Sequence, residues 1–357
     1  GKVILLYGAR QVGKTTLCQE LLKKHKGIYL HCEINQVNSI LQSKEVTNIL
    51  NLFENQKLVI LDEAQVIPNI GYILKLIHDL HPDIQIIATG SSSFDLANKA
   101  GEPLVGRSTT FTLFPLAIKE VINSVGYLKF LENIDMYLTF GLMPGVVDSA
   151  NKAQSLDNLT SGYLYKDILS HEQLKNPHLL NQILKALAFQ VGNLVSLREI
   201  ASLLGTTHNT VLKYIELLEK TFVIYRLFSY KKNLRNELNS AFKVYFWDTG
   251  FRNWLIGNTT LPGLRSDKGA LWENFCVNER IKYSSYNNEY QQFYFWRSYS
   301  GAEIDLVETK DDLVNVFEIK YSPKKSNKKF PKSFIETYLP QQKKIITKAN
   351  IQEIIEK

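Results

Sequence analysis

Short apolar runs and helical patterns alternate along the first third of the chain. The apolar runs have the length of strands, and the segments between them place apolar residues at helical spacing, as in the first of these segments at Leu17, Leu21 and Leu22. A run that is apolar at every position suits a strand buried on both faces of a parallel sheet. We therefore predict an α/β domain with a parallel sheet. Its expected strands are residues 3–7, 28–30, 58–61, 85–89 and 109–113, and its expected helices include residues 40–53 and 70–80.

The loop after the first strand carries a phosphate-binding pattern. It reads Gly8-Ala9-Arg10-Gln11-Val12-Gly13-Lys14-Thr15, is followed by Thr16, and fits G-x-x-x-x-G-K-[ST]. The two glycines let the backbone N–H groups wrap closely around phosphate, and the following helix adds a favourable dipole. Lys14 is placed to reach the β- and γ-phosphates, and the Thr15 hydroxyl to bind Mg²⁺. The sequence predicts that this loop binds a nucleotide.

Two carboxylates follow the third apolar run. Asp62 and Glu63 come directly after Leu58-Val59-Ile60-Leu61, which is a Walker B pattern. Asp62 is expected to hold Mg²⁺ together with Thr15, and Glu63 to act as the general base for the attacking water. A polar residue at the tip of the next strand, Thr89 or Ser91, is a candidate to position the γ-phosphate or the water; the alternative is a serine-rich turn that caps the next helix.

Arg107 lies between a helix and the last strand of the predicted sheet. In AAA-type ATPases this is the place of the arginine finger, which stabilises charge on the transferring phosphoryl group. A finger can be supplied by a neighbouring subunit, so we expect a homo-oligomer as one arrangement in which Arg107 is catalytic. The alternative is an ordinary surface arginine.

The middle of the chain predicts helices and a winged helix. Residues 119–174 have helical patterns, interrupted by the loop Phe140-Gly141-Leu142-Met143-Pro144-Gly145. Farther on, a helix capped by Ser196 and ended by Gly205 precedes a second helix with an inner face of Val211, Ile215 and Leu218. Residues 222–232 would supply the wing. Such a module either reads DNA or packs against the ATPase as a lid. The DNA-facing candidates are Thr207, His208, Asn209 and Lys213, with Lys231, Lys232 and Arg235 for phosphates.

The last third predicts a nuclease-like core, in the order helix, three strands, helix, strand. An acid on one strand of a hairpin, Asp305, is followed on its partner strand by Glu318-Ile319-Lys320. Glu318 and Lys320 share a face because strand residues alternate. Glu273, on the leading helix, joins Asp305 and Glu318 as an expected Mg²⁺ ligand, and Lys320 would orient or activate water. This is the PD-(D/E)xK arrangement; the alternative is the solvated face of a hairpin.

Composition indicates the cellular compartment and the kind of partner. The chain has 357 residues, a net charge of +7 and three widely separated cysteines, Cys18, Cys32 and Cys276. The cysteine pattern favours a reducing compartment, which we take to be the cytoplasm, and argues against a disulfide or zinc framework. No run approaches membrane-spanning length. Six lysines and no acid lie between Ile319 and Lys332, which suits either a polyanionic partner such as DNA or a solvated loop.

Taken together, these motifs resemble the prokaryotic AAA-type ATPases that carry a C-terminal domain of unknown function. The resemblance rests on the P-loop, Leu61 to Gln65, Thr89 to Ser93, Gly106-Arg107, Val244 to Gly250 and the Asp305 and Glu318-Lys320 pair. It implies an AAA domain over residues 1–118, a helical and winged-helix domain over 119–260 and a restriction-endonuclease-like α/β domain over 261–357. We expect the segment that precedes the P-loop strand in the family to lie outside this sequence.

Three functions follow from this organisation. The first is a Mg²⁺-dependent ATPase that acts on branched or damaged DNA. The second is a nucleotide-dependent signalling or assembly switch whose nuclease-like core is degenerate. The third is a metal-dependent nuclease gated by ATP.

Overall fold

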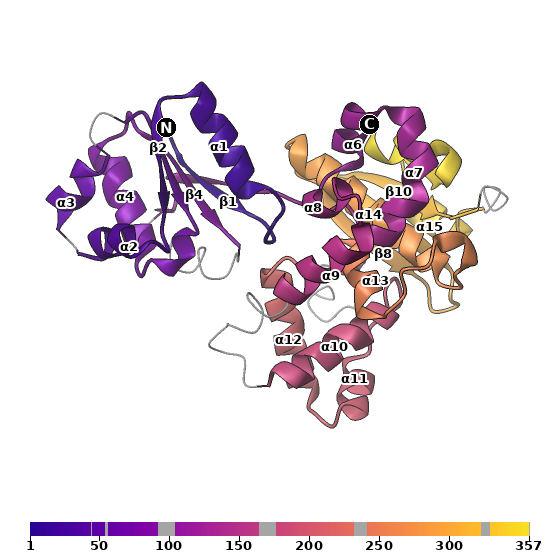
Figure 1. Ribbon diagram of the computed structural model, residues 1–357. Helices are drawn as coiled ribbons and strands as arrows, with labels where there is room; N and C mark the ends of the chain where they lie inside the picture. Colours follow the sequence, from indigo (N-terminus) through magenta and orange to yellow (C-terminus); the bar gives the residue numbers. More distant parts are fainter. Residues whose placement is uncertain are drawn as a thin grey trace. The chain divides into compact units, whose positions relative to one another are not determined.

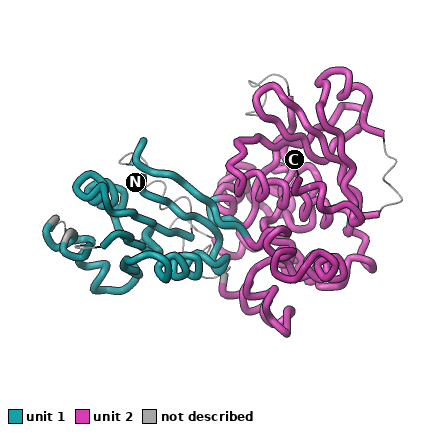
Figure 2. The backbone as a smooth tube through the Cα atoms, turned by 90° about the horizontal axis from the view of Figure 1, so that it is seen from above, with its two compact units in different colours: residues 1–114, 220–222 teal, residues 115–219, 223–357 magenta. Residues whose placement is uncertain are grey.

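A computed structural model of the chain describes residues 1–43, 45–53, 56–91, 104–163, 176–231, 241–322 and 329–356. The chain divides into two compact units (Figure 2): unit 1 consists of residues 1–114 with 220–222, and unit 2 of residues 115–219 with 223–357. In the described part of the chain, no helix has the length and apolar character needed to cross a bilayer.

Unit 1 is built on a parallel sheet of five strands in the order β2-β3-β4-β1-β5 (Figure 1). Every pair of neighbours in it is parallel. This confirms the predicted parallel-sheet domain, although one expected helix over residues 40–53 is two shorter helices. The elements are β1 (Val3–Tyr7), α1 (Lys14–Lys24), β2 (Gly27–His31), α2 (Asn35–Gln42), α3 (Val46–Asn51), β3 (Leu58–Asp62), a 3₁₀ turn (Ala64–Val66), α4 (Ile70–Leu80), β4 (Gln85–Gly90) and β5 (Ser108–Thr112).

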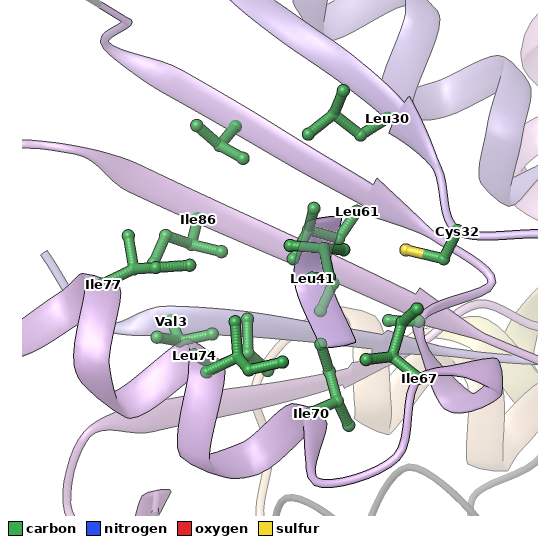
Figure 3. Packing of buried hydrophobic residues seen from close by; sticks show 14 of the residues in the cluster. Val3, Leu30, Cys32, Leu41, Leu61, Ile67, Ile70, Leu74, Ile77 and Ile86 are labelled. Atoms are coloured by element: carbon green, nitrogen blue, oxygen red, sulfur yellow. The ribbon is translucent and has the colours of Figure 1, made fainter. Parts of the chain in front are cut away.

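The sheet of unit 1 is covered on both faces, which explains why its inner strands are apolar throughout. One face packs Val3, Leu61 and Ile86 against helices α2 and α4 in a large buried cluster (Figure 3). The other face packs Leu6 and Ile60 against α1 in a smaller cluster. Strand β5 is at the edge and is largely exposed, in keeping with its alternating sequence. Two-sided burial fixes the carboxyl ends of β1, β3 and β4 side by side, and the candidate residues lie at those ends.

Unit 2 begins with helices. Ser196 caps α11 by accepting a hydrogen bond from the Glu199 N–H (3.2 Å), and α12 buries Val211, Ile215 and Leu218, as the sequence predicts. The helices are α6 (Ile118–Val125), α7 (Tyr127–Phe140), α8 (Pro144–Val147), α9 (Lys152–Tyr163), α10 (Pro177–Phe189), α11 (Leu197–Leu203), α12 (His208–Lys220), α13 (Thr249–Leu255), α14 (Lys268–Tyr286) and α15 (Lys332–Tyr338), with 3₁₀ segments at Pro262–Leu264 and Lys348–Ile355.

A mixed sheet of six strands forms the rest of unit 2, in the order β11-β10-β9-β8-β6-β7. The predicted order of helix, three strands, helix and strand after residue 268 is confirmed. The strand assigned to the wing, β6, pairs with β8 and so belongs to the same sheet as the C-terminal strands. The boundary at residue 260 therefore falls within one unit, and the winged helix and three-domain division stay predictions. The strands are β6 (Ile224–Ser229), β7 (Phe242–Phe246), β8 (Gln292–Arg297), β9 (Glu303–Lys310), β10 (Leu313–Ile319) and β11 (Gln342–Ile346).

A buried carboxylate ties the helices of unit 2 to this sheet. Asp248 follows β7, caps α13 at the Phe251 N–H (2.9 Å) and accepts a second bond from the Leu142 N–H (2.7 Å). A Cβ at Gly141 would come within 2.2 Å of an Asp248 oxygen, so the loop after α7 needs glycine there. Burial raises the pKa of Asp248 despite these bonds. The motif around Asp248 is therefore a structural clamp.

Candidate functional site

The P-loop lies at the carboxyl end of β1 and has the backbone that its glycines allow. Gly13 has φ of +102° as the N-cap of α1, a conformation that side chains other than hydrogen rarely adopt. At Gly8, a Cβ would stand 2.2 Å from the Leu113 carbonyl oxygen. The two glycines therefore serve different needs: Gly13 turns the chain into the helix, and Gly8 lets the loop pass closely over the end of the edge strand.

Lys14 begins α1 and turns back over this loop. Its side chain is only 5% exposed, and its Nζ donates to the carbonyl oxygens of Gly8 and Ala9, both at 2.8 Å. The two backbone carbonyls hold this ammonium at the loop, and a fixed positive charge there favours an anion beside it. The position of Lys14 thus fits the binding of phosphate by the loop.

Asp62 ends β3 and receives hydroxyl groups from three other elements. Thr15 Oγ1 donates to Asp62 Oδ2 at 2.9 Å, and the Tyr29 and Thr89 hydroxyls also donate to this carboxylate. Burial alone would raise the pKa of Asp62, but the three hydrogen bonds outweigh it and hold the pKa below its ordinary value. Asp62 is therefore charged at neutral pH, and its contact with Thr15 joins the two expected Mg²⁺ ligands.

Glu63 stands beside this carboxylate in a left-handed conformation, with φ of +53°. Its backbone N–H donates to Thr89 Oγ1 at 3.1 Å, and its side chain accepts a bond from Gln65 Nε2 at 2.5 Å. The same Gln65 amide lies 3.4 Å from Ser91 Oγ. Thr89 is fully buried and acts on Asp62 and Glu63 by positioning them, while Ser91 shares a side-chain partner with Glu63.

Arg107 lies at the amino ends of β1 and β5, whereas the P-loop follows the carboxyl end of β1. Its carbonyl accepts the Val3 N–H at the start of β1 (2.8 Å), and its Nε donates to Asp79 at 2.9 Å. Tyr7, at the carboxyl end of β1, pairs with Thr112 of β5. Arg107 lies five residues before Thr112, at about 3.3 Å per residue along the strand. An arginine side chain does not span this distance, so Arg107 does not reach the P-loop of its own chain. The arginine finger stays a prediction for action in trans.

A second set of charged residues lies on the sheet of unit 2. Asp305 Oδ2 accepts bonds from Lys320 Nζ (2.6 Å) and from the Ile319 N–H (2.7 Å). Lys320 Nζ also lies 2.8 Å from Glu318 Oε2. Burial lowers the pKa of Lys320, but the two carboxylates overcome this and raise it. The structure therefore brings Asp305, Glu318 and Lys320 together, with the lysine between the acids.

Glu273 of α14 is held by the buried Lys243 and lies near enough to Asp305 to interact with it electrostatically. Lys243 Nζ bonds Glu273 Oε1 (2.9 Å) and Glu303 Oε1 (2.6 Å), and the Tyr245 hydroxyl donates to the same Glu273 oxygen. Burial raises the pKa of Glu273 to about 7, although Lys243 opposes the shift. Across the described ranges, no group of three or more His, Cys, Asp or Glu side chains is arranged to hold a metal ion. The nuclease Mg²⁺ site at Glu273, Asp305 and Glu318 stays a prediction.

Several residues of both centres were missed from the sequence. Tyr29 lies in β2, beside β3 in the sheet, and nothing local in its sequence marks it as a partner of Asp62. Lys243 and Tyr245 alternate on β7, and the two-residue spacing of polar groups within an apolar strand was the available signal. Gln65 follows the Walker B acids directly, so its position was visible but its role was not.

The predicted DNA-facing residues are placed only in part. Thr207, His208, Asn209 and Lys213 are exposed on and before α12. The proposed wing residues Lys232 and Arg235 lie outside the described residues, as do Ser92 and Ser93 and the loop lysines Lys324, Lys325 and Lys328. DNA contact by this region stays a prediction.

Comparison with known families divides the chain into three parts. Residues 1–122 match the AAA domain family, residues 131–261 match a domain of unknown function (DUF8612), and residues 268–355 match a second one (DUF4143). The AAA match covers the P-loop, both Walker B acids and Arg107.

The relatives come from distant prokaryotes. An uncharacterized protein of Mycobacterium tuberculosis is 28% identical over 324 residues, which cover 89% of this chain and 70% of the relative. Uncharacterized proteins of Methanocaldococcus jannaschii (24% over 341 residues; 88% and 74% covered) and Haemophilus influenzae (24% over 297 residues; 77% and 72% covered) are also similar. The chain carries an AAA domain at its N-terminus and a DUF4143 domain at its C-terminus, and its relatives share most of this length.

Proposed function

We propose that the N-terminal domain binds ATP with Mg²⁺ and hydrolyses it. The observation that carries this proposal is the 2.9 Å hydrogen bond between Thr15 of the P-loop and Asp62 of Walker B. It joins two hard oxygen groups, one of them charged, next to the buried Lys14 ammonium. Hard oxygen groups are the ligands that Mg²⁺ takes in nucleotide sites, so the residues fit the cofactor.

Each residue then has a defined task. The backbone N–H groups of the loop and the Lys14 Nζ bind the phosphates, and Thr15 and Asp62 hold the metal. Bound Mg²⁺ supplies neutralisation of the charge on the phosphate oxygens. Glu63 accepts the proton of the attacking water on a carboxylate oxygen, and Gln65 fixes the orientation of that carboxylate. Thr89 positions both acids through its hydroxyl.

The test is ATP hydrolysis by the purified protein and by Lys14→Ala. We expect the variant to lose about a hundredfold or more in kcat, because the charge on the transferred phosphoryl group loses a fixed cation. Lys23→Ala is the matched control, since Lys23 lies on the same helix, is 70% exposed and pairs with Glu20 on the surface. If Lys14→Ala hydrolyses ATP as fast as the control, the assignment of the P-loop is wrong.

A second proposal concerns DNA. We propose that hydrolysis drives a transaction on branched or damaged DNA, with the acid–lysine centre of unit 2 gripping or cutting the strand. The adjacency of Asp305, Glu318 and Lys320 supports it, because the PD-(D/E)xK chemistry needs those three side chains together. Asp305→Ala is then expected to abolish any cleavage and to leave ATP hydrolysis intact.

The same assay separates this proposal from a signalling or assembly switch. Hydrolysis is measured without DNA and with duplex, single-stranded and four-way-junction DNA. Stimulation by one form, lost in Lys14→Ala, supports a DNA transaction and names its substrate. Slow hydrolysis that ignores every DNA form, together with nucleotide-dependent assembly, supports the switch. If Arg107 acts in trans, Arg107→Ala lowers hydrolysis only at protein concentrations at which the chain assembles.

A further inference from the structure

A cavity in unit 2 has a cationic lining that includes none of Asp305, Glu318, Lys320 and Glu273. Its volume is about 570 Å³, and its lining contains two lysines and no carboxylate. Cavities of roughly 300–1,000 Å³ have the size of small-molecule and cofactor sites. The lining residues are Leu131, Ile134, Lys268, Tyr321, Ser322, Lys348 and Ala349.

The Tyr321 ring contacts both lysines of the lining. Lys268 Nζ lies 5.7 Å and Lys348 Nζ 5.1 Å from the centre of its ring, and the ring itself packs edge-on against Trp272. Contact with an aromatic face attracts an ammonium but does not neutralise its charge. The aromatic contact therefore places two cations at one cavity without cancelling either.

The charges at this cavity are not balanced. Lys348 pairs with Asp135 Oδ1 at 2.7 Å, and the Tyr321 hydroxyl donates to the same oxygen at 3.3 Å. Lys268, which is half-buried, forms no ion pair with any carboxylate in the described part of the chain. The nearest acid in sequence, Asp267, bonds Arg252 and Arg265 instead. One positive charge at the cavity is thus left for a ligand to neutralise.

We infer that this cavity binds an organic phosphate, with the phosphate group between Lys268 and Lys348 and its less polar part against Leu131, Ile134 and Ala349. Lysine binds phosphate as a point charge, and the apolar side chains give the rest of the ligand a surface to cover. The source of the phosphate is either a free nucleotide or the phosphorylated end of a nucleic-acid strand. This site is distinct from the P-loop and does not depend on the ATPase proposal.

The test is calorimetric titration of the full chain carrying Lys14→Ala, which weakens phosphate binding at the P-loop. The probes are AMP and a 5′-phosphorylated single-stranded oligonucleotide, at 50 mM and 500 mM salt. We expect binding at low salt that weakens at high salt, because part of the attraction is screened. Lys268→Gln is expected to weaken binding about tenfold, as for the loss of one charge-assisted bond. Lys310→Gln, an exposed lysine at the end of β9, is the matched control and leaves binding unchanged.

Asp135→Asn is expected to strengthen binding, and a misfolded variant would not do so. The Asp135 carboxylate competes with a phosphate for Lys348, so this variant is expected to bind the probe severalfold more tightly than the parent. Binding of AMP identifies a free nucleotide as the source, and binding of the oligonucleotide alone identifies a strand end. The inference is overturned if neither probe binds, if Lys268→Gln binds as the parent does, or if Asp135→Asn weakens binding.

Discussion

The two acid centres hold a buried aspartate in opposite ways. Asp62 and Asp305 are 1% and 6% exposed, and each lies on a central strand of its sheet. Asp62 accepts hydrogen bonds from three neutral hydroxyls, whereas Asp305 accepts from the Lys320 ammonium and a backbone N–H. In the described ranges, no lysine or arginine forms an ion pair with Asp62.

This difference separates a carboxylate prepared for a cation from one that already has a cation. Hydroxyl dipoles stabilise the charged form of Asp62 without cancelling its charge, so a divalent ion still gains from binding there. An ammonium cancels the charge of Asp305, and a metal would have to compete with it. Asp62 and Asp305 both resemble metal ligands in the sequence. Their hydrogen-bond partners in the structure are what make their expected chemistry different.

The largest expected effect is on the stability of the lysine-compensated centre. Lys243→Met leaves Glu273 and Glu303 without the ammonium that bridges them, in a place where Lys243 is 1% exposed. Breaking a buried ion pair by removing one partner costs about 3–5 kcal/mol. We expect urea unfolding to show a loss of that size, against less than about 0.5 kcal/mol for the exposed control Lys310→Met. A small loss in both variants would mean that the bridged carboxylates are neutral in the folded protein.

The next effect distinguishes the two aspartates directly. Asp62→Asn removes the charge but keeps an oxygen for the hydroxyl groups, so we expect kcat for ATP to fall about a hundredfold, equivalent to about 2.7 kcal/mol. Asp305→Asn is expected to leave ATP hydrolysis unchanged and to cost about 1–3 kcal/mol of unfolding free energy. Both variants are measured for hydrolysis and for unfolding. Equal losses of hydrolysis would contradict the assignment of the metal to Asp62.

A smaller effect tests the hydroxyl shell of Asp62. Tyr29→Phe removes one of the hydrogen bonds that lower the pKa of Asp62, so that pKa rises. The carboxylate then protonates at higher pH, and hydrolysis is lost earlier as pH falls. We expect the acid limb of the pH profile to move upward by about 0.7 pH unit, the worth of roughly one hydrogen bond of 1 kcal/mol, and hydrolysis at pH 7 to stay close to that of the parent.

The control for this change is Tyr72→Phe, because Tyr72 lies on α4 and is 60% exposed. An unchanged acid limb in Tyr29→Phe would show that the other two hydroxyls suffice to keep Asp62 charged.

The sequence was most informative where a function is contained in one continuous stretch. The P-loop and the Walker B pair specify their own strand, turn and helix, so local rules placed Lys14, Thr15 and Asp62 correctly at one sheet edge. The partners of these residues come from other strands. Tyr29 reaches Asp62 only because β2 lies beside β3, and strand order is a tertiary property that no local pattern of residues 27–31 encodes.

The dependence on strand order also explains which residues of the C-terminal part could not be predicted from the sequence. Alternation predicted that Glu318 and Lys320 share a face, and their 2.8 Å contact agrees. The bridging Lys243 comes from β7, at the far edge of the sheet order from β11 and sixty residues before Glu303. The local sequence of β6 is typical of a wing, so β6 and β7 were expected to belong to the winged-helix domain. The pairing of β6 with β8 shows that both strands belong to the C-terminal sheet. Non-local pairing decided both misses.

The smallest effect tests whether Lys320 is what separates the two centres. In Lys320→Gln, Asp305 and Glu318 lose the ammonium that they share, so a cation gains more from binding beside them than in the parent. Both this variant and its parent carry Asp62→Asn, so that the P-loop centre binds no ion. Without nucleotide, 5 mM Mg²⁺ is expected to stabilise the variant by about 0.4–1 kcal/mol, which corresponds to a dissociation constant of roughly 1–5 mM. The parent is expected to change by less than half of this, because the Lys320 ammonium already lies between its two carboxylates. Adding Asp305→Asn removes one of the two carboxylates and is expected to abolish the response to Mg²⁺. If the parent responds as strongly as Lys320→Gln, Mg²⁺ binds beside the lysine, and the two aspartates differ in their partners but not in their chemistry.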